Sequence, residues 1–63
     1  MNELKEARKS RGLTQFQLSM LSGVNHSNIS RIEGGVESPT LATLERLARA
    51  MDMKLVIEFK EKE

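Results

Sequence analysis

The sequence predicts a small, mainly α-helical domain with four helices, followed by one C-terminal β-strand. The chain has 63 residues, which is too few for more than one domain at about 100–200 residues each. Apolar residues recur at helical spacing in four segments that glycines or short loops separate. After Asp52 the apolar residues alternate with polar ones, which is typical of a strand. We therefore expect a single domain over 1–63, with a helical part over 1–52 and a strand over 53–60.

Composition excludes several classes of function. The chain contains no cysteine and one histidine, so disulfides, thiolate zinc sites and multi-histidine metal sites are not expected, and neither is a cofactor. The acidic residues form no pair suited to acid–base catalysis, and Ser27 and Ser30 beside His26 have no oxyanion device, so we do not expect an enzyme. A charged N-terminus and short apolar runs predict a cytoplasmic protein without a membrane segment.

The first two helices are indicated by their ends. The segment LKEARKSR has helical spacing and is followed by Gly12, a residue typical of helix C-termini. Thr14 and Gln17 have the spacing of a capping box, in which each side chain bonds the backbone of the other. A second helix is thus predicted from Thr14 to about Ser22, with Leu18 and Leu21 buried.

The third helix is predicted over HSNISRIE, with Asn25 as its N-cap and Ile29 and Ile32 facing inward. Gly23 lies in the short connection before it, where a left-handed backbone is expected. Ser38 and Pro39 resemble a cap and first turn. A fourth helix follows them, and its apolar positions at helical spacing are Leu41, Leu44, Leu47, Ala48 and Met51.

Two short helices joined by a three-residue turn that contains glycine form a helix-turn-helix. The stretch LTQFQLSMLSGVNHSNISRIEGG resembles the DNA-binding domain of the phage Cro and repressor family, also called the XRE family, and SPTLATLERLARAM is similar to its fourth helix. The resemblance covers roughly residues 3–52. The strand MKLVIEF departs from the family's usual fifth helix and resembles antitoxins of the HipB and HigA kinds.

The resemblance implies double-stranded DNA as a partner, with the third helix in the major groove. The predicted base-reading residues are His26, Ser27, Asn28 and Arg31. The predicted phosphate contacts are Gln15, Asn25, Ser30 and Arg8. The family also implies that Arg8 pairs with Glu33. Formal net charge is only +1, so a few well-placed groups must provide the binding.

Several residues admit a second interpretation. Arg31 can instead be a solvated charge or form an intrachain ion pair, and His26 can be an exposed first-turn residue. Gln15 can be a simple helix-start residue. Phe16 and Met20 lie outside the expected buried face, where they either pack against a neighbouring helix, which we favour, or contact a partner protein.

The C-terminal strand predicts a homodimer. Its apolar face consists of Met53, Leu55, Ile57 and Phe59, and nothing else in the chain resembles a strand that could pair with it. Pairing between two copies would supply that partner. The leading hypothesis is a repressor that binds a palindromic operator as a homodimer. The alternative is an antitoxin of a type II toxin–antitoxin pair that binds a toxin protein and autoregulates its operon.

Overall fold

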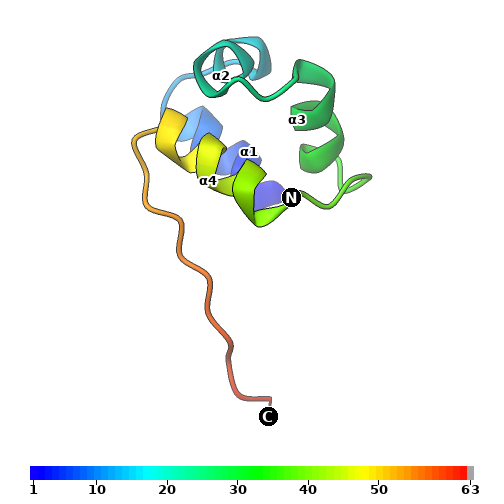
Figure 1. The fold of residues 1–63 in the computed structure, drawn as a ribbon, viewed down its shortest axis with the longest axis vertical. Coiled ribbons are helices and arrows are strands. Elements are labelled where there is room, and N and C mark those ends of the chain that lie inside the picture. The colour runs from blue at the N-terminus through cyan, green and yellow to red at the C-terminus, as the bar shows by residue number, and fades with distance from the viewer. Residues whose placement is uncertain (63) are drawn as a thin grey trace.

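The computed structural model describes residues 1–62. It contains four α-helices: α1 (Asn2–Ser10), α2 (Gln15–Ser22), α3 (His26–Glu33) and α4 (Leu41–Ala50). Helix α2 packs against both α3 and α4, and α1 packs against α3. In Figure 1 these four helices form one body, and the C-terminal segment runs away from it. The predicted mainly helical fold with four helices is confirmed.

One hydrophobic core joins the four helices. Its fully buried side chains are Leu18, Ile29, Ile32 and Leu47, and they come from α2, α3 and α4. Leu4 of α1 and Met51 after α4 complete the cluster. Removing such side chains from water is the main force that holds a domain of this size together. The predicted inward face of α3 is confirmed.

Local sequence chemistry determines both ends of α2 and the start of α3 as predicted. Thr14 and Gln17 form a complete capping box at the start of α2, and the Asn25 side chain accepts the Ser27 N–H at the start of α3. Gly23 ends α2 with φ of 74°, in the left-handed region. A Cβ at this position would lie 3.2 Å from Nη2 at the end of the exposed Arg46 side chain, which can move aside, so it is the left-handed backbone that requires glycine here.

The predicted buried face of α2 is wrong at Leu21, which is 61% exposed. The covered stripe of this helix passes through Gln15, Leu18, Ser19 and Ser22, which is the i, i+3, i+4, i+7 spacing of one helical face. Leu21 lies one position beside that stripe. Phe16 lies on the other side of the stripe and Met20 lies opposite to it, and both are exposed. The expected packing against a neighbouring helix is therefore wrong for Met20, whereas Phe16 keeps a ring contact with His26 of α3.

The start of α4 also differs from the prediction. The N-cap is Thr40, whose Oγ1 accepts the Thr43 N–H at 3.1 Å, and the helix begins after Ser38 and Pro39 rather than with them. A cap residue must place its hydroxyl within one turn of a free backbone N–H, and Thr40 does so here. Leu41, as the first residue of α4, is exposed rather than buried.

The predicted strand over 53–60 is not formed in the single chain. Residues 53–62 carry no regular secondary structure and extend away from the helices (Figure 1). Strand pairing needs a neighbouring strand to accept and donate backbone hydrogen bonds, and the described part of this chain contains none. Met53 and Leu55 are half-buried, whereas Ile57 and Phe59 are exposed. None of the helices described over residues 1–62 is long and apolar enough to cross a membrane.

Candidate nucleic-acid interface

Helix α3 has two faces of opposite character. Ile29 and Ile32 are buried in the core. The other side exposes polar side chains, those of His26, Ser27, Ser30 and Arg31, while Asn28 is half-buried between the two faces. Because α2 and α1 pack behind α3, the polar side chains lie on a convex helix surface that can enter a groove.

Two of the predicted base-reading residues have contacts within the chain. Nε of Arg31 donates to Oε1 of Glu37 at 2.9 Å, and Nη2 of Arg31 donates to Oδ1 of Asn28. The pair of Arg31 and Glu37 is partly exposed. The alternative of an intrachain ion pair for Arg31 is therefore present in the unbound protein, and it leaves the Nη1 group of Arg31 without a partner among residues 1–62.

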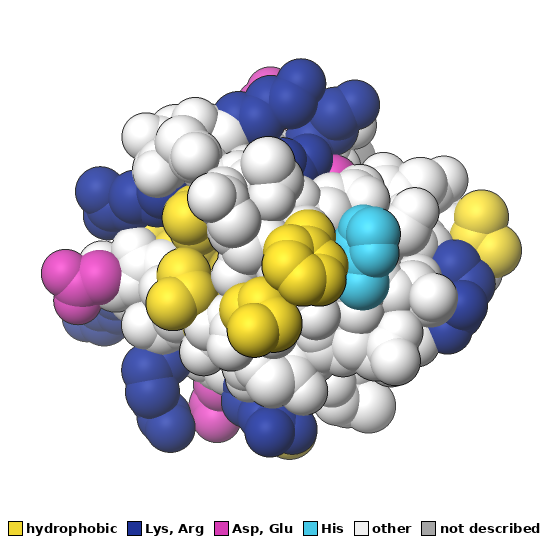
Figure 2. Space-filling model, turned by 90° about the horizontal axis from the view of Figure 1, so that it is seen from above, with side chains coloured by type: hydrophobic (Ala, Val, Ile, Leu, Met, Phe, Trp, Pro, Cys, Tyr) yellow, Lys and Arg dark blue, Asp and Glu magenta, His cyan; other side chains and the backbone are white. Residues whose placement is uncertain are grey.

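His26 lies at the start of α3 and contacts the first turn of α2. Its ring meets the Phe16 ring edge to face, with the centroids 6.4 Å apart and the planes at 88°. Figure 2 shows hydrophobic side chains gathered on this side of the molecule, with the histidine next to them and Lys and Arg side chains around the edge. Aromatic rings prefer this edge-to-face geometry, so the contact favours this orientation of the His26 ring.

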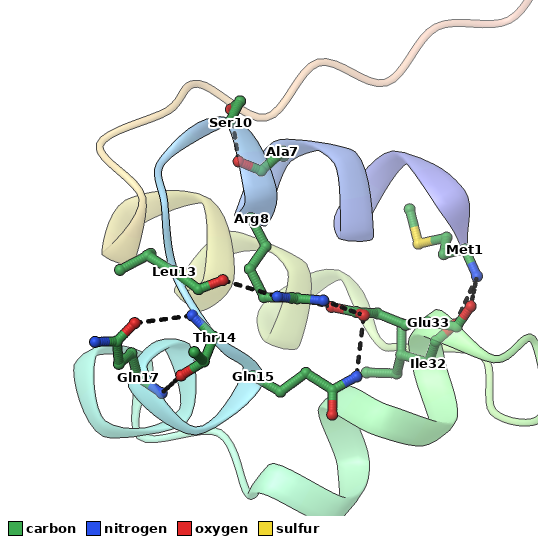
Figure 3. A network of polar contacts seen from close by, with 10 residues as sticks. All are labelled: Met1, Ala7, Arg8, Ser10, Leu13, Thr14, Gln15, Gln17, Ile32 and Glu33. Atoms are coloured by element: carbon green, nitrogen blue, oxygen red, sulfur yellow. Dashed lines mark hydrogen bonds and ion pairs between the residues drawn. The ribbon is translucent and has the colours of Figure 1, made fainter.

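Behind this surface, Arg8 of α1 and Glu33 of α3 form a buried ion pair (Figure 3). Nε of Arg8 donates to Oε2 of Glu33 at 2.7 Å, and Nη2 donates to Oε1 at 3.0 Å. This two-bond geometry is the strongest that an arginine and a carboxylate can form. Nη1 of Arg8 donates in addition to the Leu13 carbonyl at 2.7 Å, so the guanidinium also holds the connection between α1 and α2.

The hydrogen bond from Arg8 lowers the pKa of the Glu33 carboxyl below its ordinary value, although burial acts in the opposite direction. The hydrogen bond to Glu33 likewise raises the pKa of Arg8. No buried side-chain nitrogen or oxygen atom among the described residues lacks a hydrogen-bond partner. The pair is therefore ionised at neutral pH and fully satisfied.

Gln15 connects this buried pair to the surface. Its Nε2 donates to Oε1 of Glu33 at 3.1 Å (Figure 3), and the residue is half-buried at the first position of α2. The first turn of a helix has free backbone N–H groups that attract anions. The structure thus holds Gln15 at a helix end with part of its amide exposed, whereas Asn25 and Ser30 lie on the exposed side of α3.

Arg8, which was also predicted to contact a phosphate, is buried in the unbound protein. Only 7% of the residue is exposed, and its guanidinium already donates to Glu33 and Leu13. Three of the five N–H donors of the guanidinium are engaged in this way, and the predicted phosphate contact of Arg8 stays a prediction. We therefore describe Arg8 as a residue that positions α1, the following turn and α3 relative to one another.

Sequence reasoning missed three polar contacts. Nε of Arg11 donates to the Met51 carbonyl at 3.0 Å and so joins the end of α1 to the end of α4. The Met1 ammonium donates to the carbonyls of Ile32 and Glu33 at 2.6 and 3.0 Å (Figure 3), where the negative end of the α3 dipole favours a cation. The partner of Arg31, Glu37, was also missed. The cations of Arg11 and Met1 and their carbonyl acceptors lie far apart in the sequence, so no local pattern predicts these contacts.

Known proteins support this interpretation of the surface. Residues 4–57 match the helix-turn-helix family. An uncharacterized HTH-type transcriptional regulator of Sinorhizobium fredii is 40% identical over 55 residues, which cover 87% of this chain and 28% of that protein. The HTH-type transcriptional regulator PuuR of Escherichia coli is 40% identical over 60 residues, covering 95% of this chain and 32% of that protein.

An uncharacterized HTH-type transcriptional regulator of Haemophilus influenzae is 40% identical over 57 residues, covering 90% of this chain and 58% of that protein. The chain thus spans about a third of the length of the first two relatives and more than half of the third. No solved structure gives a significant match. The match over most of the chain, together with the α2–turn–α3 geometry, shows that this protein belongs to the helix-turn-helix family.

Proposed function

We propose that this chain binds double-stranded DNA at specific sequences and regulates transcription, as a repressor. The observation that carries the proposal is the division of α3 into a buried apolar face and an exposed polar face at its N-terminal half. In helix-turn-helix proteins this half of the second motif helix contacts base edges in the major groove. The relatives named as transcriptional regulators support the same function.

Base reading is assigned to four residues of α3, namely the exposed His26, Ser27 and Arg31 and the half-buried Asn28. Arg31 is the strongest candidate, because a guanidinium can donate two hydrogen bonds to O6 and N7 of guanine. Gln15, Asn25 and Ser30 are assigned to phosphates, since they lie at helix ends or on the exposed side of α3. Phosphate contacts set the position of the protein on DNA and add no sequence preference.

Affinity measurements on a panel of duplexes test these roles. The duplexes come from selection on a random-sequence library and from single-base variants of the selected site. Arg31→Ala should weaken binding to the selected site by about 1–3 kcal/mol and remove the preference at one base position. Gln15→Ala should weaken binding to all duplexes alike.

Arg49→Ala is the matched control, because Arg49 is an exposed arginine of α4 and its removal changes the net charge equally. It should leave base preference unchanged. A protein that selects no common sequence from the library would refute specific DNA binding. A uniform loss for Arg31→Ala would instead make that residue a phosphate contact.

We further propose that the functional unit is a homodimer formed by residues 53–59. The apolar side chains Ile57 and Phe59 are exposed in the single chain, where they would be unfavourable in water. An apolar groove of about 220 Å³ between α1 and α4 is lined by Leu4, Leu47 and the start of the C-terminal segment. Antiparallel pairing of two such segments over these helices would bury both the exposed apolar side chains and the groove. It would also place two copies of α3 about 34 Å apart, matching a palindromic operator.

Sedimentation distinguishes this dimer from a monomer. Truncation after Asp52 should give a monomer with weak operator binding, as should Ile57→Lys. Glu58→Lys is the matched control, because Glu58 alternates with the proposed apolar face, does not line the groove and should tolerate a change of charge. A truncated chain that stays dimeric and keeps full operator affinity would exclude residues 53–59 as the dimer element.

An antitoxin function is the second candidate, with a toxin protein as the partner. The apolar patch of α2, formed by Phe16, Met20 and Leu21, is exposed by 61–71% at each residue, and contiguous exposed apolar side chains of this kind are typical of protein-binding surfaces. Co-purification from the native operon followed by a mobility shift on its own promoter tests this function. Met20→Gln should abolish toxin binding and leave DNA affinity unchanged. Val36→Gln, at another exposed apolar residue, is the control and should change neither toxin binding nor DNA affinity.

A further inference from the structure

Glu37 is the only acidic partner that the structure gives to Arg31 among residues 1–62. Its carboxylate accepts a hydrogen bond from Nε of Arg31 at 2.9 Å. The side chains are 47% and 36% exposed for Arg31 and Glu37. The residue proposed to read a base is thus already oriented, before DNA binds, by a carboxylate at the edge of the same surface.

The backbone holds Glu37 in this place. The N–H groups of Val36 and Glu37 both donate to the Arg31 carbonyl, at 2.9 and 3.3 Å. Gly35, with φ of 77°, allows the chain to reverse direction after α3. Glu37 is therefore joined to Arg31 twice, through the backbone carbonyl and through the guanidinium. The backbone bonds therefore keep the Glu37 carboxylate within reach of the Arg31 guanidinium.

Glu37 accepts a hydrogen bond from Nε of Arg31, and this determines which donors of Arg31 remain for DNA. A guanidinium has five N–H donors, of which one is on Nε. The Nε–H group donates to Glu37, and one N–H of Nη2 donates to Asn28. Guanine accepts two parallel hydrogen bonds, at O6 and N7. Because Nε–H already donates to Glu37, these two bonds must come from N–H groups of Nη1 and Nη2. Guanine can therefore bind Arg31 while Glu37 stays in place, once Asn28 Oδ1 moves aside.

A phosphate is affected differently by Glu37. The carboxylate neutralises part of the guanidinium charge and repels a phosphate that approaches the same group. Arg31 paired with Glu37 therefore binds the phosphates of an arbitrary duplex weakly. Its Nη1 and Nη2 donors remain able to bind guanine. The carboxylate thus weakens non-specific binding more than it weakens binding to the correct site.

We propose that Glu37 is a specificity-determining residue, which positions Arg31 for guanine and prevents its use as a general phosphate contact. This inference rests on the proposed base-reading role of Arg31 and extends it to a loop residue outside the helix-turn-helix. It predicts that removing the carboxylate strengthens DNA binding and makes it less selective.

The test compares the full-length protein and its Glu37→Gln variant on two duplexes: the site selected from a random library and a scrambled duplex of equal composition. We expect Glu37→Gln to bind the scrambled duplex about 2- to 5-fold more tightly, the range expected for an exposed ion pair. Binding to the selected site should change less. The preference for guanine at the Arg31 position should fall about 3-fold.

Two controls separate this role from a change in net charge. Glu45→Gln removes an exposed carboxylate of α4 and should raise affinity for both duplexes equally, leaving guanine preference intact. In an Arg31→Ala background, Glu37→Gln should no longer alter preference at that base position. An unchanged guanine preference in Glu37→Gln, or an equal gain on both duplexes, would overturn the inference.

The failure of the inference differs from the failure of the proposed function. If the wild-type protein selects no common sequence, specific DNA binding itself is refuted, and the role of Glu37 with it. If it selects a site whose guanine preference is lost in Arg31→Ala but survives in Glu37→Gln, the DNA-binding function and the base-reading role of Arg31 stand, and only the role of Glu37 is refuted.

Discussion

Two ion pairs of the same chemical type attach to α3, and they differ in their surroundings. Arg8 and Glu33 lie 2.7 Å apart with 9% and 4% of their side chains exposed. Arg31 and Glu37 lie 2.9 Å apart with 47% and 36% exposed. The separations are nearly equal, so distance does not distinguish the pairs. Burial and the number of further hydrogen bonds do.

The difference indicates two roles on one helix. The buried pair connects residues 25 positions apart and has additional partners in Leu13 and Gln15, so it fixes how α1, α2 and α3 fit together. The exposed pair connects residues six positions apart and is partly exposed to solvent, so its loss costs the fold little, and the remaining donors of Arg31 stay accessible to a ligand. The first pair maintains the shape of the surface, and the second adjusts what that surface binds.

The largest predicted effect is the loss of one member of the buried pair. Arg8→Ala should lower the free energy of unfolding by about 3 kcal/mol, the lower end for breaking a buried pair, because a small domain keeps buried charges near solvent. Urea denaturation followed by circular dichroism measures the loss. Arg49→Ala, which removes an exposed arginine of α4, should cost less than about 0.5 kcal/mol.

A double-mutant cycle checks that the effect comes from the pair. Glu33→Ala should cost about as much as Arg8→Ala, and the two losses should be non-additive by about 0.5 kcal/mol or more, since the second substitution removes a partner already lost. Additive losses would show that each residue stabilises the fold independently of the other.

Local patterns allowed much of the fold to be predicted. A capping box involves residues three positions apart, so Thr14 and Gln17 alone determine it. Ile29 and Ile32 follow from helical spacing. The pairing of Arg8 with Glu33 was implied only by family resemblance, because residues far apart in sequence carry no local signal. Its presence in the structure therefore depends on the arrangement of whole helices.

The features that the sequence did not predict depend on how the helices and loops pack and on a strand that one chain does not provide. Leu21 has helical spacing to Leu18, yet the angle at which α2 packs leaves it exposed. The contact of Glu37 with Arg31 depends on the path of the loop through Gly35, which composition does not specify. Strand formation over 53–60 depends on a second strand, and the described residues of one chain do not provide it.

The second prediction concerns pH and acts through the same buried pair. The hydrogen bond from Arg8 lowers the pKa of Glu33 in the folded state below its ordinary value of 4.5. A lowered folded-state pKa gives stability that is present above the unfolded value and is lost as pH falls through the folded value. The free energy of unfolding should therefore decrease in acid, by less than the Arg8→Ala loss, because the protonated carboxyl still accepts hydrogen bonds.

Unfolding measured in urea from about pH 7 to about pH 3 tests this dependence. Glu33→Gln should remove this part of the acid response, and Arg8→Met should reduce it, since the Glu33 carboxyl then loses the main cause of its lowered pKa. If wild type and Glu33→Gln lose stability in parallel over this range, the pair does not account for the acid sensitivity.

The smallest predicted effect is on the exposed pair. Glu37→Gln should change the free energy of unfolding by less than about 1 kcal/mol, and the change should vanish in about 1 M salt, where the Debye length falls to about 3 Å. The loss caused by Glu33→Gln should persist at that salt concentration, because a buried pair is screened much less. A cost of about 2 kcal/mol or more for Glu37→Gln, far above the range for surface pairs, would show that both pairs maintain the fold. The contrast between the two pairs would then be wrong, because the exposed pair would maintain the fold as the buried pair does.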